Sequence, residues 1–290
     1  MKTWTVVNPV AGRGRAARVW ARLQDQLKNQ GMIFETHYTQ GPGHAMEIGR
    51  KAVEQEVQQL VVVGGDGTLH ELVNGVGPTG KRLGVIPAGT GNDLARTLKI
   101  PHRPEAALGL LFHGREREID LGLVNGHYFT NIAGVGFDAA VAHHVNTGRH
   151  LINGTVTYLL AVLMQLWKFR CLPAEITLDG EKLSRRIFLL AAGNAKYYGG
   201  GMMMVPSAEP DDGTLDVVLG WDFTRLEILR ALMLIFSGRH LGLPKLLQRR
   251  VREIYVTSSQ PLALHADGEV IGTTPAHFRI VPRALKVLVP

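Results

Sequence analysis

The feature that most constrains the fold of this chain is the segment GGDGTLHELVNG at residues 64–75. It follows a short apolar, β-branched run at residues 60–63, which is typical of a buried strand. Apolar residues then recur at the spacing of one helix face, and Thr68 precedes Glu71 by three positions, the spacing of a helix capping box. The glycines and Asp66 are therefore expected on a turn that leads from a strand into a helix.

This turn has the composition of a phosphate site. Gly64, Gly65 and Gly67 permit positive φ angles and a close backbone approach. Backbone amides at a helix N-terminus attract anions, most often phosphate. An aspartate at the same place would repel a bare phosphate, but Asp66 is suited to hold Mg²⁺ or to orient a hydroxyl that attacks phosphorus. The motif thus indicates a kinase that lacks a Walker A lysine.

Strands and helices alternate through the first hundred residues. We expect strands at residues 4–8, 32–38, 60–63 and 83–86, and helices near 16–30, 44–56 and 93–98. This alternation predicts a parallel sheet covered by helices on both faces, with ligands beyond the carboxyl ends of its strands. Three glycine-bearing turns fall there, at residues 9–14, 64–67 and 88–92. The last continues into PAGTGNDLAR, where Thr90-x-x-Asp93 has the spacing of a second capping box.

Hairpin signals dominate beyond residue 118. Asn125-Gly126, Asp179-Gly180 and Asp267-Gly268 each separate two short apolar runs, and such pairs are strong markers of a tight β-turn. Residues 120–280 are therefore expected to form a mostly antiparallel β domain with one or two inserted helices. The last strand, at residues 285–289, could pair with either domain.

Composition limits the range of partners. The 290-residue chain has a net charge of +7 and a pI near 9.7, which fits nucleic acid, an anionic lipid surface or phosphate-bearing substrates; without a nucleic-acid signature, the first is the weakest. Its one cysteine and the lack of a secretory signal predict a cytoplasmic protein. Two apolar stretches, at residues 155–167 and 228–236, are too short to span a membrane. They predict core-packed helices, with contact to a membrane surface as the alternative.

The motifs together resemble the diacylglycerol kinase catalytic domain and the bacterial lipid kinases of the YegS/BmrU type. The likeness runs nearly end to end and rests mainly on GGDGTLHELVNG followed by PAGTGNDLAR. It extends to Asn8-Pro9, the Gly134–Asp138 region (GVGFD), Gly193-Asn194, and Asp267-Gly268-Glu269. The resemblance implies a fold shared with NAD kinases: an α/β, Rossmann-like ATP-binding domain at residues 1–120 and an antiparallel β-sandwich domain for the lipid substrate at residues 121–290.

The resemblance also implies roles for individual residues. Asp66 would work with the catalytic Mg²⁺, Asp120 would join a carboxylate–water network that reaches this metal, and Asp267 or Glu269 would be the catalytic base. The loop at residues 206–216 resembles a structural Mg²⁺ site whose ligands are the Asp212 side chain and the main-chain oxygens of Glu209 and Thr214. Thr214 replaces the usual leucine, a change that a main-chain ligand should tolerate. The residues expected to contact ATP are Asn8, Gly12, Thr39, Gly65, Asp66, Gly67, Thr68, Leu69, His70, Glu71 and Thr90.

These inferences predict an ATP- and Mg²⁺-dependent kinase that phosphorylates a hydroxyl of diacylglycerol, phosphatidylglycerol or a related lipid. The protein would have no transmembrane span and would dock peripherally on the inner membrane face. Members of this family often pair, so the oligomeric state is left open between a monomer and a homodimer. One alternative is an NAD kinase, which shares GGDGT, although the later Asn-Glu pair of those enzymes is missing. The other is a regulator that binds nucleotide and membrane without turnover.

Overall fold

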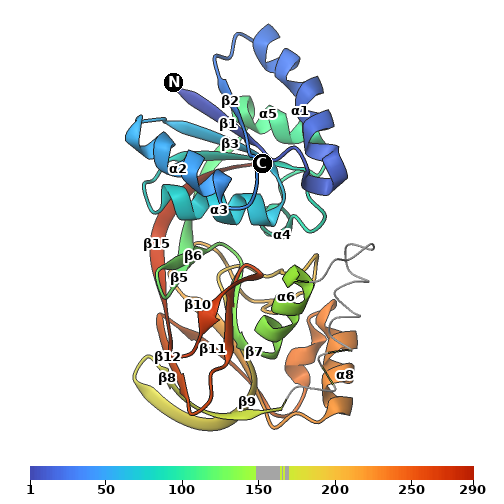
Figure 1. The fold of residues 1–290 in the computed structure, drawn as a ribbon, viewed down its shortest axis with the longest axis vertical. Coiled ribbons are helices and arrows are strands. Elements are labelled where there is room, and N and C mark those ends of the chain that lie inside the picture. Colours follow the sequence, from blue (N-terminus) through green and yellow to red (C-terminus); the bar gives the residue numbers. More distant parts are fainter. Residues whose placement is uncertain (148–163, 165, 167–169) are drawn as a thin grey trace. The chain divides into compact units, whose positions relative to one another are not determined.

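The computed structural model describes residues 1–147, 164, 166 and 170–290 of the chain. They form two compact units, one of Met1–Leu121 with Pro282–Pro290 and the other of Gly122–Val281 (Figure 1). The chain enters the second unit within strand β5 (Arg115–Val124) and returns within strand β15 (Ala276–Val289). The apolar stretch expected at residues 155–167 lies outside the described residues except for Met164 and Leu166.

The first unit is built on a parallel sheet with the strand order β15-β4-β3-β1-β2. Its other strands are β1 (Thr3–Val7), β2 (Glu35–Tyr38), β3 (Gln59–Gly64) and β4 (Arg82–Pro87). Every residue of β1 and β3 is buried, as expected for strands that are covered on both faces. The predicted α/β architecture is thus confirmed.

Five helices cover this sheet: α1 (Ala11–Asn29), α2 (His44–Glu54), α3 (Asp66–Val76), α4 (Asp93–Thr97) and α5 (Pro104–His113) (Figure 1). Helices α1 and α5 form a core with Val61 and Val63 of β3. Helix α3 packs beside Leu60 of the same strand, and because side chains alternate along a strand, this is the opposite face. The helices thus cover the two faces of the sheet, and the turns lie at the carboxyl ends of its strands.

The second unit is an antiparallel β structure with the strand order β14-β13-β7-β9-β8-β12-β15, in which β10 pairs with β9 and β11. The three predicted turns are confirmed as hairpins that join β5 to β6, β8 to β9, and β13 to β14. The strands introduced here are β6 (His127–Phe129), β7 (Ile132–Gly136), β8 (Leu172–Leu178), β9 (Glu181–Gly193), β10 (Leu215–Trp221), β11 (Leu246–Val251), β12 (Glu253–Ser258), β13 (Ala263–Ala266) and β14 (Glu269–Thr273).

Two helices of the second unit, α6 (Phe137–Thr147) and α8 (Arg225–Ile235), cover a core separate from the one between the strands. Helix α8 begins with a true capping box, in which Thr224 and Glu227 bond each other's backbone amides. The predicted core-packed helix at residues 228–236 is confirmed on one face, where Ile228 and Ile235 are buried. None of the helices in the described residues is long and apolar enough to cross a membrane.

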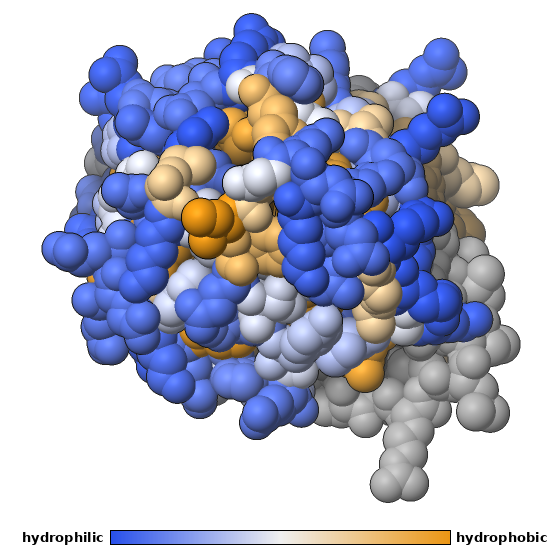
Figure 2. All heavy atoms as spheres, turned by 90° about the horizontal axis from the view of Figure 1, so that it is seen from above, coloured by the Kyte–Doolittle hydropathy of each residue, from blue (hydrophilic) through white to orange (hydrophobic). Residues whose placement is uncertain are grey.

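The other face of α8 is apolar and exposed. Leu226, Met233 and Phe236 are exposed by 79%, 76% and 47%, and their spacing places them on one stripe of the helix. Figure 2 shows one face of the molecule, which is mainly hydrophilic with some apolar side chains among the polar ones. On α8 the three exposed apolar side chains share their side of the helix with the exposed Arg230, and such a cluster is a candidate docking surface.

Candidate active site

The glycine-bearing turns at residues 64–67 and 88–92 are in backbone contact. The carbonyl oxygen of Gly64 accepts hydrogen bonds from the amides of Ala88 (2.8 Å) and Gly89 (3.1 Å). A Cβ atom on Gly65 would lie 3.0 Å from the Cα atom of Gly89, and one on Gly89 would overlap Gly65. Both motifs therefore need glycine here because no side chain fits between the two turns.

The turn at residues 9–14 contacts the turn at residues 88–92. Gly12, Arg13 and Gly14 have φ angles of 57°, 58° and 78° at the start of α1, so this segment is a left-handed loop rather than helix. A Cβ atom on Gly12 would overlap the carbonyl oxygen of Ala88. The three turns that the sequence places after strands β1, β3 and β4 thus lie together at one edge of the sheet.

A cleft of about 420 Å³ opens at this edge, within the first unit. Of the described residues that line it, none is lysine or arginine, so an anion there would be bound by backbone amides and the N-terminus of α3. The lining residues are Asn8, Pro9, Val10, Ala11, Gly12, Thr39, Gln40, Gly41, Pro42, Gly65, Gly67, Thr68, Glu71 and Gly89.

The residues expected to contact ATP divide into two groups. Seven of them line the cleft: Asn8, Gly12, Thr39, Gly65, Gly67, Thr68 and Glu71. The other four do not line it: Leu69 and His70 are buried on the inner side of α3, Asp66 is partly buried at the start of this helix, and Thr90 is exposed. The lining is tied together by a 2.9 Å hydrogen bond from Asn8 Nδ2 to Thr68 Oγ1.

The predicted capping box between Thr68 and Glu71 is wrong. Helix α3 begins at Asp66, so Thr68 already lies inside it, and Gly65 is its cap without a side-chain bond. Glu71 instead accepts hydrogen bonds from the amides of Gly43 (2.8 Å) and Ala45 (3.1 Å) at the N-terminus of α2. A carboxylate satisfies unpaired amides of a helix start as well from another helix as from its own.

The second predicted capping box, between Thr90 and Asp93, is wrong for a similar reason. Helix α4 begins after Asn92, which has a left-handed backbone and bonds Gly89 through both side-chain atoms. The amide of Asp93 donates to Asp66 Oδ1 over 2.7 Å. Asp66 therefore caps α4 across the junction of the two glycine turns, and this bond fixes the direction of its carboxylate.

The end of the opening motif has a packing role. A Cβ atom on Gly75 would overlap the carbonyl oxygen of Met46, and one on Gly49 would lie 2.9 Å from the carbonyl oxygen of Leu72, so α2 and α3 are in backbone contact. Asn74 Nδ2 donates to the carbonyl oxygen of His70 over 2.9 Å. Gly75 thus permits the close contact of the two helices, whereas Asn74 bonds within α3.

In the second unit, Asp267 is the centre of a hydrogen-bond cluster. Its carboxylate accepts from the amides of Thr130 (2.8 Å), Asn131 (2.8 Å) and Ile132 (3.1 Å), and from the Thr130 hydroxyl (3.1 Å). These donors hold the hairpin between β13 and β14 against the start of β7. Glu269, two residues further, is exposed at the first position of β14.

Sequence reasoning missed a buried pair behind this hairpin. His265 Nε2 lies 3.1 Å from Asp138 Oδ2, and both side chains are at most 2% exposed. The amide of Gly268 donates to His265 Nδ1 over 3.2 Å, so the ring proton belongs on Nε2, which donates to Asp138. A Cβ atom on Gly134 would overlap Asp138 Oδ2, which explains a glycine there and was the only trace of the pair in the sequence.

Asp120 lies in the first unit and is 1% exposed. Its Oδ1 accepts a 2.8 Å hydrogen bond from the amide of Arg283, a residue of β15 with a φ angle of 50°. This contact stabilises an irregular point in the strand that returns from the second unit. Its expected part in a metal-linked network stays a prediction.

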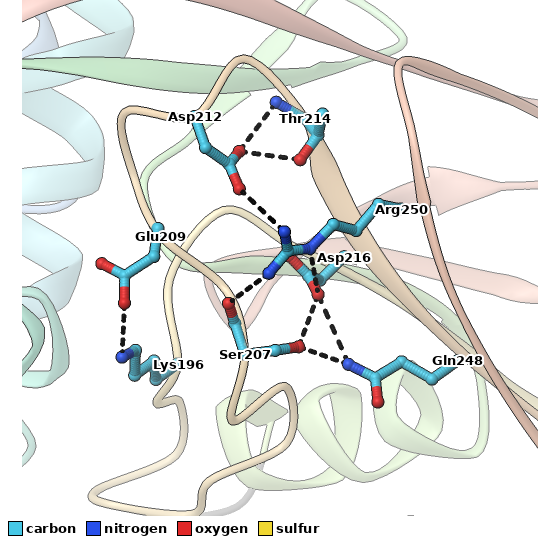
Figure 3. Close-up of polar contacts among 8 residues, drawn as sticks. All are labelled: Lys196, Ser207, Glu209, Asp212, Thr214, Asp216, Gln248 and Arg250. Carbon is cyan, nitrogen blue, oxygen red and sulfur yellow. Dashed lines mark hydrogen bonds and ion pairs between the residues drawn. The ribbon is translucent and has the colours of Figure 1, made fainter.

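The three expected ligands of a structural Mg²⁺ lie on one loop (Figure 3). Asp212 Oδ1 accepts from the amide (3.0 Å) and the hydroxyl (2.7 Å) of Thr214, and Glu209 Oε1 forms a 2.7 Å ion pair with Lys196. Among the described residues, no group of three or more His, Cys, Asp or Glu is arranged to hold a metal ion. The carboxylates of this loop face donors of the chain itself.

A small, mainly apolar pocket of about 50 Å³ lies in the second unit, between β9, β10, α6 and α8. Its walls include Phe188, Met202 and Met204, which confirms that this methionine run fills a core. His240 also lines it, and burial lowers the pKa of this histidine below its usual range, although its bond to the carbonyl oxygen of Met204 opposes the shift. Burial thus disfavours a charged His240, and Asp138 is the one carboxylate among the described residues of the lining.

Comparisons with known proteins agree with this arrangement. Residues 2–124 match the profile of the diacylglycerol kinase catalytic domain, and residues 131–289 match that of the YegS C-terminal NAD kinase beta sandwich-like domain. Diacylglycerol kinase of Mycobacterium tuberculosis (strain H37Rv) is 33% identical over 100% of this chain and 95% of its own length. That of Bacillus subtilis (strain 168) is 31% identical over 98% of this chain and 95% of its own.

Solved structures share the fold. Two structures from Bacillus anthracis str. Sterne, the second described as a diacylglycerol kinase, superpose with TM-scores of 0.81 and 0.74 at 23% and 21% identity. Each covers 100% of this chain and 97% of the other. With an α/β unit that carries the glycine-lined cleft, a β-sandwich unit, and both profiles matched, the chain belongs to the YegS/BmrU-type family of diacylglycerol kinase-like proteins.

Proposed function

We propose that this kinase uses ATP and Mg²⁺ to phosphorylate a hydroxyl of diacylglycerol, phosphatidylglycerol or a related lipid. The observation that carries the proposal is the meeting of three glycine turns at the N-terminus of α3, beside a cleft without basic side chains. Such a site binds phosphates through backbone amides and the helix dipole. Family membership supports the phosphoryl transfer and the lipid acceptor.

Within the cleft, Gly65, Gly67 and Gly12 would let the phosphates approach the backbone, and the Asn8–Thr68 pair would orient a polar group of the nucleotide. Asp66 would hold the catalytic Mg²⁺, because its carboxylate is already fixed by the amide of Asp93. When bound, Mg²⁺ neutralises the charge that develops on the transferred phosphoryl group.

Glu269 is the better of the two candidates for the catalytic base. Four hydrogen-bond donors hold the Asp267 carboxylate, and such bonds favour the charged form and stabilise the hairpin. A base must be able to reach a substrate hydroxyl, and Glu269 lies exposed on the same turn. Asp267 would then position the turn while Glu269 orients the lipid hydroxyl and takes its proton.

The small pocket of the second unit would receive the methyl end of an acyl chain of the acceptor. It is lined mainly by aromatic, Met, Leu and Ile side chains, with His240 and Asp138 also in its wall, and its volume is about 50 Å³. Ala231→Trp would fill it. We expect this variant to raise KM for a long-chain lipid about tenfold or less, because a few lost methylene contacts change affinity by that order, and to spare a short-chain analogue.

The exposed stripe of α8 would dock the protein on the membrane where its substrate resides. Leu226, Met233 and Phe236 would enter the interface, and the exposed Arg230 and Arg239 would meet anionic head groups. Leu226→Glu with Met233→Glu should abolish sedimentation with phosphatidylglycerol vesicles and leave turnover of a micellar short-chain lipid unchanged. Unchanged vesicle binding by the folded double variant would contradict this docking mode.

The proposed function is tested by transfer of radiolabelled γ-phosphate from ATP to diacylglycerol, to phosphatidylglycerol and to NAD, offered separately. We expect label on a lipid and none on NAD. Asp66→Ala should lower the rate by about 10³-fold, since loss of the metal carboxylate removes several kcal/mol of transition-state stabilisation. Asp25→Ala, which removes an exposed carboxylate of α1, is the control. Full turnover by a folded Asp66→Ala variant would refute the role of Asp66, and label on NAD alone would refute the lipid acceptor.

A further inference from the structure

The loop at residues 206–216, which resembles a cation site, is closed by an arginine from a neighbouring strand. Figure 3 shows Arg250 reaching across the loop, with its guanidinium between the side chains of Asp212 and Asp216 and the backbone of Ser207. Each of these groups presents an oxygen atom toward the guanidinium.

Asp216 is the buried partner. Its carboxylate is 1% exposed and accepts a 2.6 Å hydrogen bond from Ser207 Oγ, with Gln248 Nε2 at 3.4 Å and Arg250 Nε at 3.5 Å. A carboxylate removed from water in this way needs a positive charge or several donors to remain ionised. Arg250 supplies the charge, and Ser207 and Gln248 supply donors.

The sheet places these groups. Strands β10 and β11 pair antiparallel with Asp216 directly opposite Arg250, so the two side chains stand on one face. Gln248 is two residues away from Arg250 and shares this face, whereas Arg249 points to the other and pairs with Glu181 over 2.6 Å. The register, and not a flexible surface contact, therefore brings Arg250 to the loop.

The guanidinium extends from Asp216 to the rest of the loop. Arg250 Nη2 donates to the carbonyl oxygen of Ser207 over 3.2 Å, and Nη1 lies 4.0 Å from Asp212 Oδ2. The second oxygen of Asp212 is engaged by Thr214, at the position where the hydroxyl replaces an apolar side chain of relatives. One planar cation thus touches the beginning, the middle and the end of the loop.

A divalent cation makes different demands. Mg²⁺ requires near-octahedral oxygen ligands at about 2.0–2.1 Å and keeps several waters. In this chain Asp212, the expected side-chain ligand, accepts from Thr214 through Oδ1 and lies 4.0 Å from Arg250 Nη1 through Oδ2, so both of its oxygens face donors of the chain. These oxygen acceptors fit a guanidinium, which donates several directed hydrogen bonds and cannot lose its charge.

We propose that Arg250 takes the place of a structural divalent cation at the loop of residues 206–216, and that this loop is ordered without Mg²⁺. Arg250 and Thr214 then meet the charge and the hydrogen-bonding groups of the loop from within the chain. This inference does not rest on the proposed acceptor or on catalysis. It concerns the stability of the second unit in the absence of nucleotide.

The test measures the thermal unfolding temperature of the full chain without nucleotide, in EDTA and in millimolar MgCl₂. We expect the unchanged protein to unfold at the same temperature in both. Arg250→Met should unfold roughly 5 °C lower in EDTA, because a loop carboxylate loses its countercharge, and should recover part of this loss in MgCl₂. Arg249→Met, which removes only the pair with Glu181 on the other face, is the matched control and should show no response to Mg²⁺.

Arg250→Lys provides a second variant if Arg250→Met fails to fold. Lysine keeps the charge but not the fork of donors, so we expect a smaller loss of stability and a weaker response to Mg²⁺. A drop in the unfolding temperature of the unchanged protein on EDTA treatment, reversed by MgCl₂, would overturn the proposal. So would an Arg250 variant with the stability of the unchanged protein and no response to Mg²⁺.

Discussion

The tripeptide Asp-Gly-Glu occurs twice in the second unit, at residues 179–181 and 267–269, on hairpins of the same backbone conformation. The φ angles of Asp179 and Gly180 are 45° and 91°, and those of Asp267 and Gly268 are 50° and 90°. Both aspartates accept amide hydrogen bonds from a neighbouring strand start: Asp179 from Arg252 and Glu253, and Asp267 from three residues at the start of β7. Sequence and backbone therefore do not separate the two copies.

Their surroundings do. Asp179 is exposed, and Glu181 forms a 2.6 Å surface ion pair with Arg249. The second copy is partly buried, gains the Thr130 hydroxyl as a further donor, and has the buried His265–Asp138 pair behind Gly268. The second hairpin is thus held by more hydrogen bonds than the first, and a carboxylate on a firmly held turn is the better candidate for a catalytic role.

The largest difference is expected between the glutamates. Glu269→Gln should lower kcat for lipid phosphorylation by about 10²–10⁴-fold, the usual contribution of a general base. Glu181→Gln should change it less than twofold, because an exposed ion pair contributes about 1 kcal/mol or less to stability and nothing to the chemistry. Steady-state kinetics with both variants measures the contrast. Equal activities would remove the distinction between the hairpins.

The aspartates should differ in stability. Asp267→Ala leaves four donors without their acceptor and should lower the free energy of unfolding by about 3 kcal/mol, whereas Asp179→Ala, at an exposed turn, should cost about 1 kcal/mol. Urea unfolding of the two variants compares them. If Asp267→Ala were fully stable but inactive, Asp267 itself would become the better candidate for the base.

The buried pair behind the second hairpin should have a smaller and separable effect. His265→Leu leaves Asp138 Oδ2 without the imidazole donor, while Oδ1 keeps the amide of Ala139, and we expect a loss of about 2 kcal/mol. The double variant with Asp138→Leu should regain part of this loss. If His265 positions the turn, kcat should stay low in the restored double variant while KM for ATP is unchanged. Recovery of kcat together with stability would reduce the pair to a packing contact.

The smallest difference is expected between the turn glycines. A Cβ atom on Gly180 or Gly268 would meet no other atom within 4 Å, so only the backbone strain at φ near 90° opposes a side chain. Gly180→Ala and Gly268→Ala should each cost about 1–2 kcal/mol of stability, with no difference between them. A much larger loss at Gly268 would show that its amide bond to His265 depends on the unstrained turn.

Local patterns predicted much of this molecule because they depend on near neighbours. The buried strand before Gly64, the three Asx-Gly hairpins and the helix ending near Phe236 each follow from a short periodicity or a turn residue. The three glycine turns were expected at one sheet edge because parallel strands end there. The close backbone contact between Gly65 and Gly89 confirms that two of these turns lie together.

Contacts between distant residues could not be predicted. Thr68 and Glu71 have capping-box spacing, yet Glu71 caps α2, because the packing of α2 on α3 offers amides that the sequence order does not reveal. The His265–Asp138 pair joins residues 127 positions apart, and Arg250 meets Asp216 only through the register of β10 and β11. In each case a polar group is satisfied by tertiary structure rather than by its neighbours in sequence.

The continuity of β15 has a consequence for synthesis of the protein. Residues 276–279 pair with β12 in the second unit, while Lys286 and Val287 pair with β4 in the first, where Leu285, Val287 and Leu288 are buried. Most of the first unit is thus translated before the second, but its β4 edge can pair with β15 only after the second unit has been translated. Until then this edge of the sheet is open to other strands.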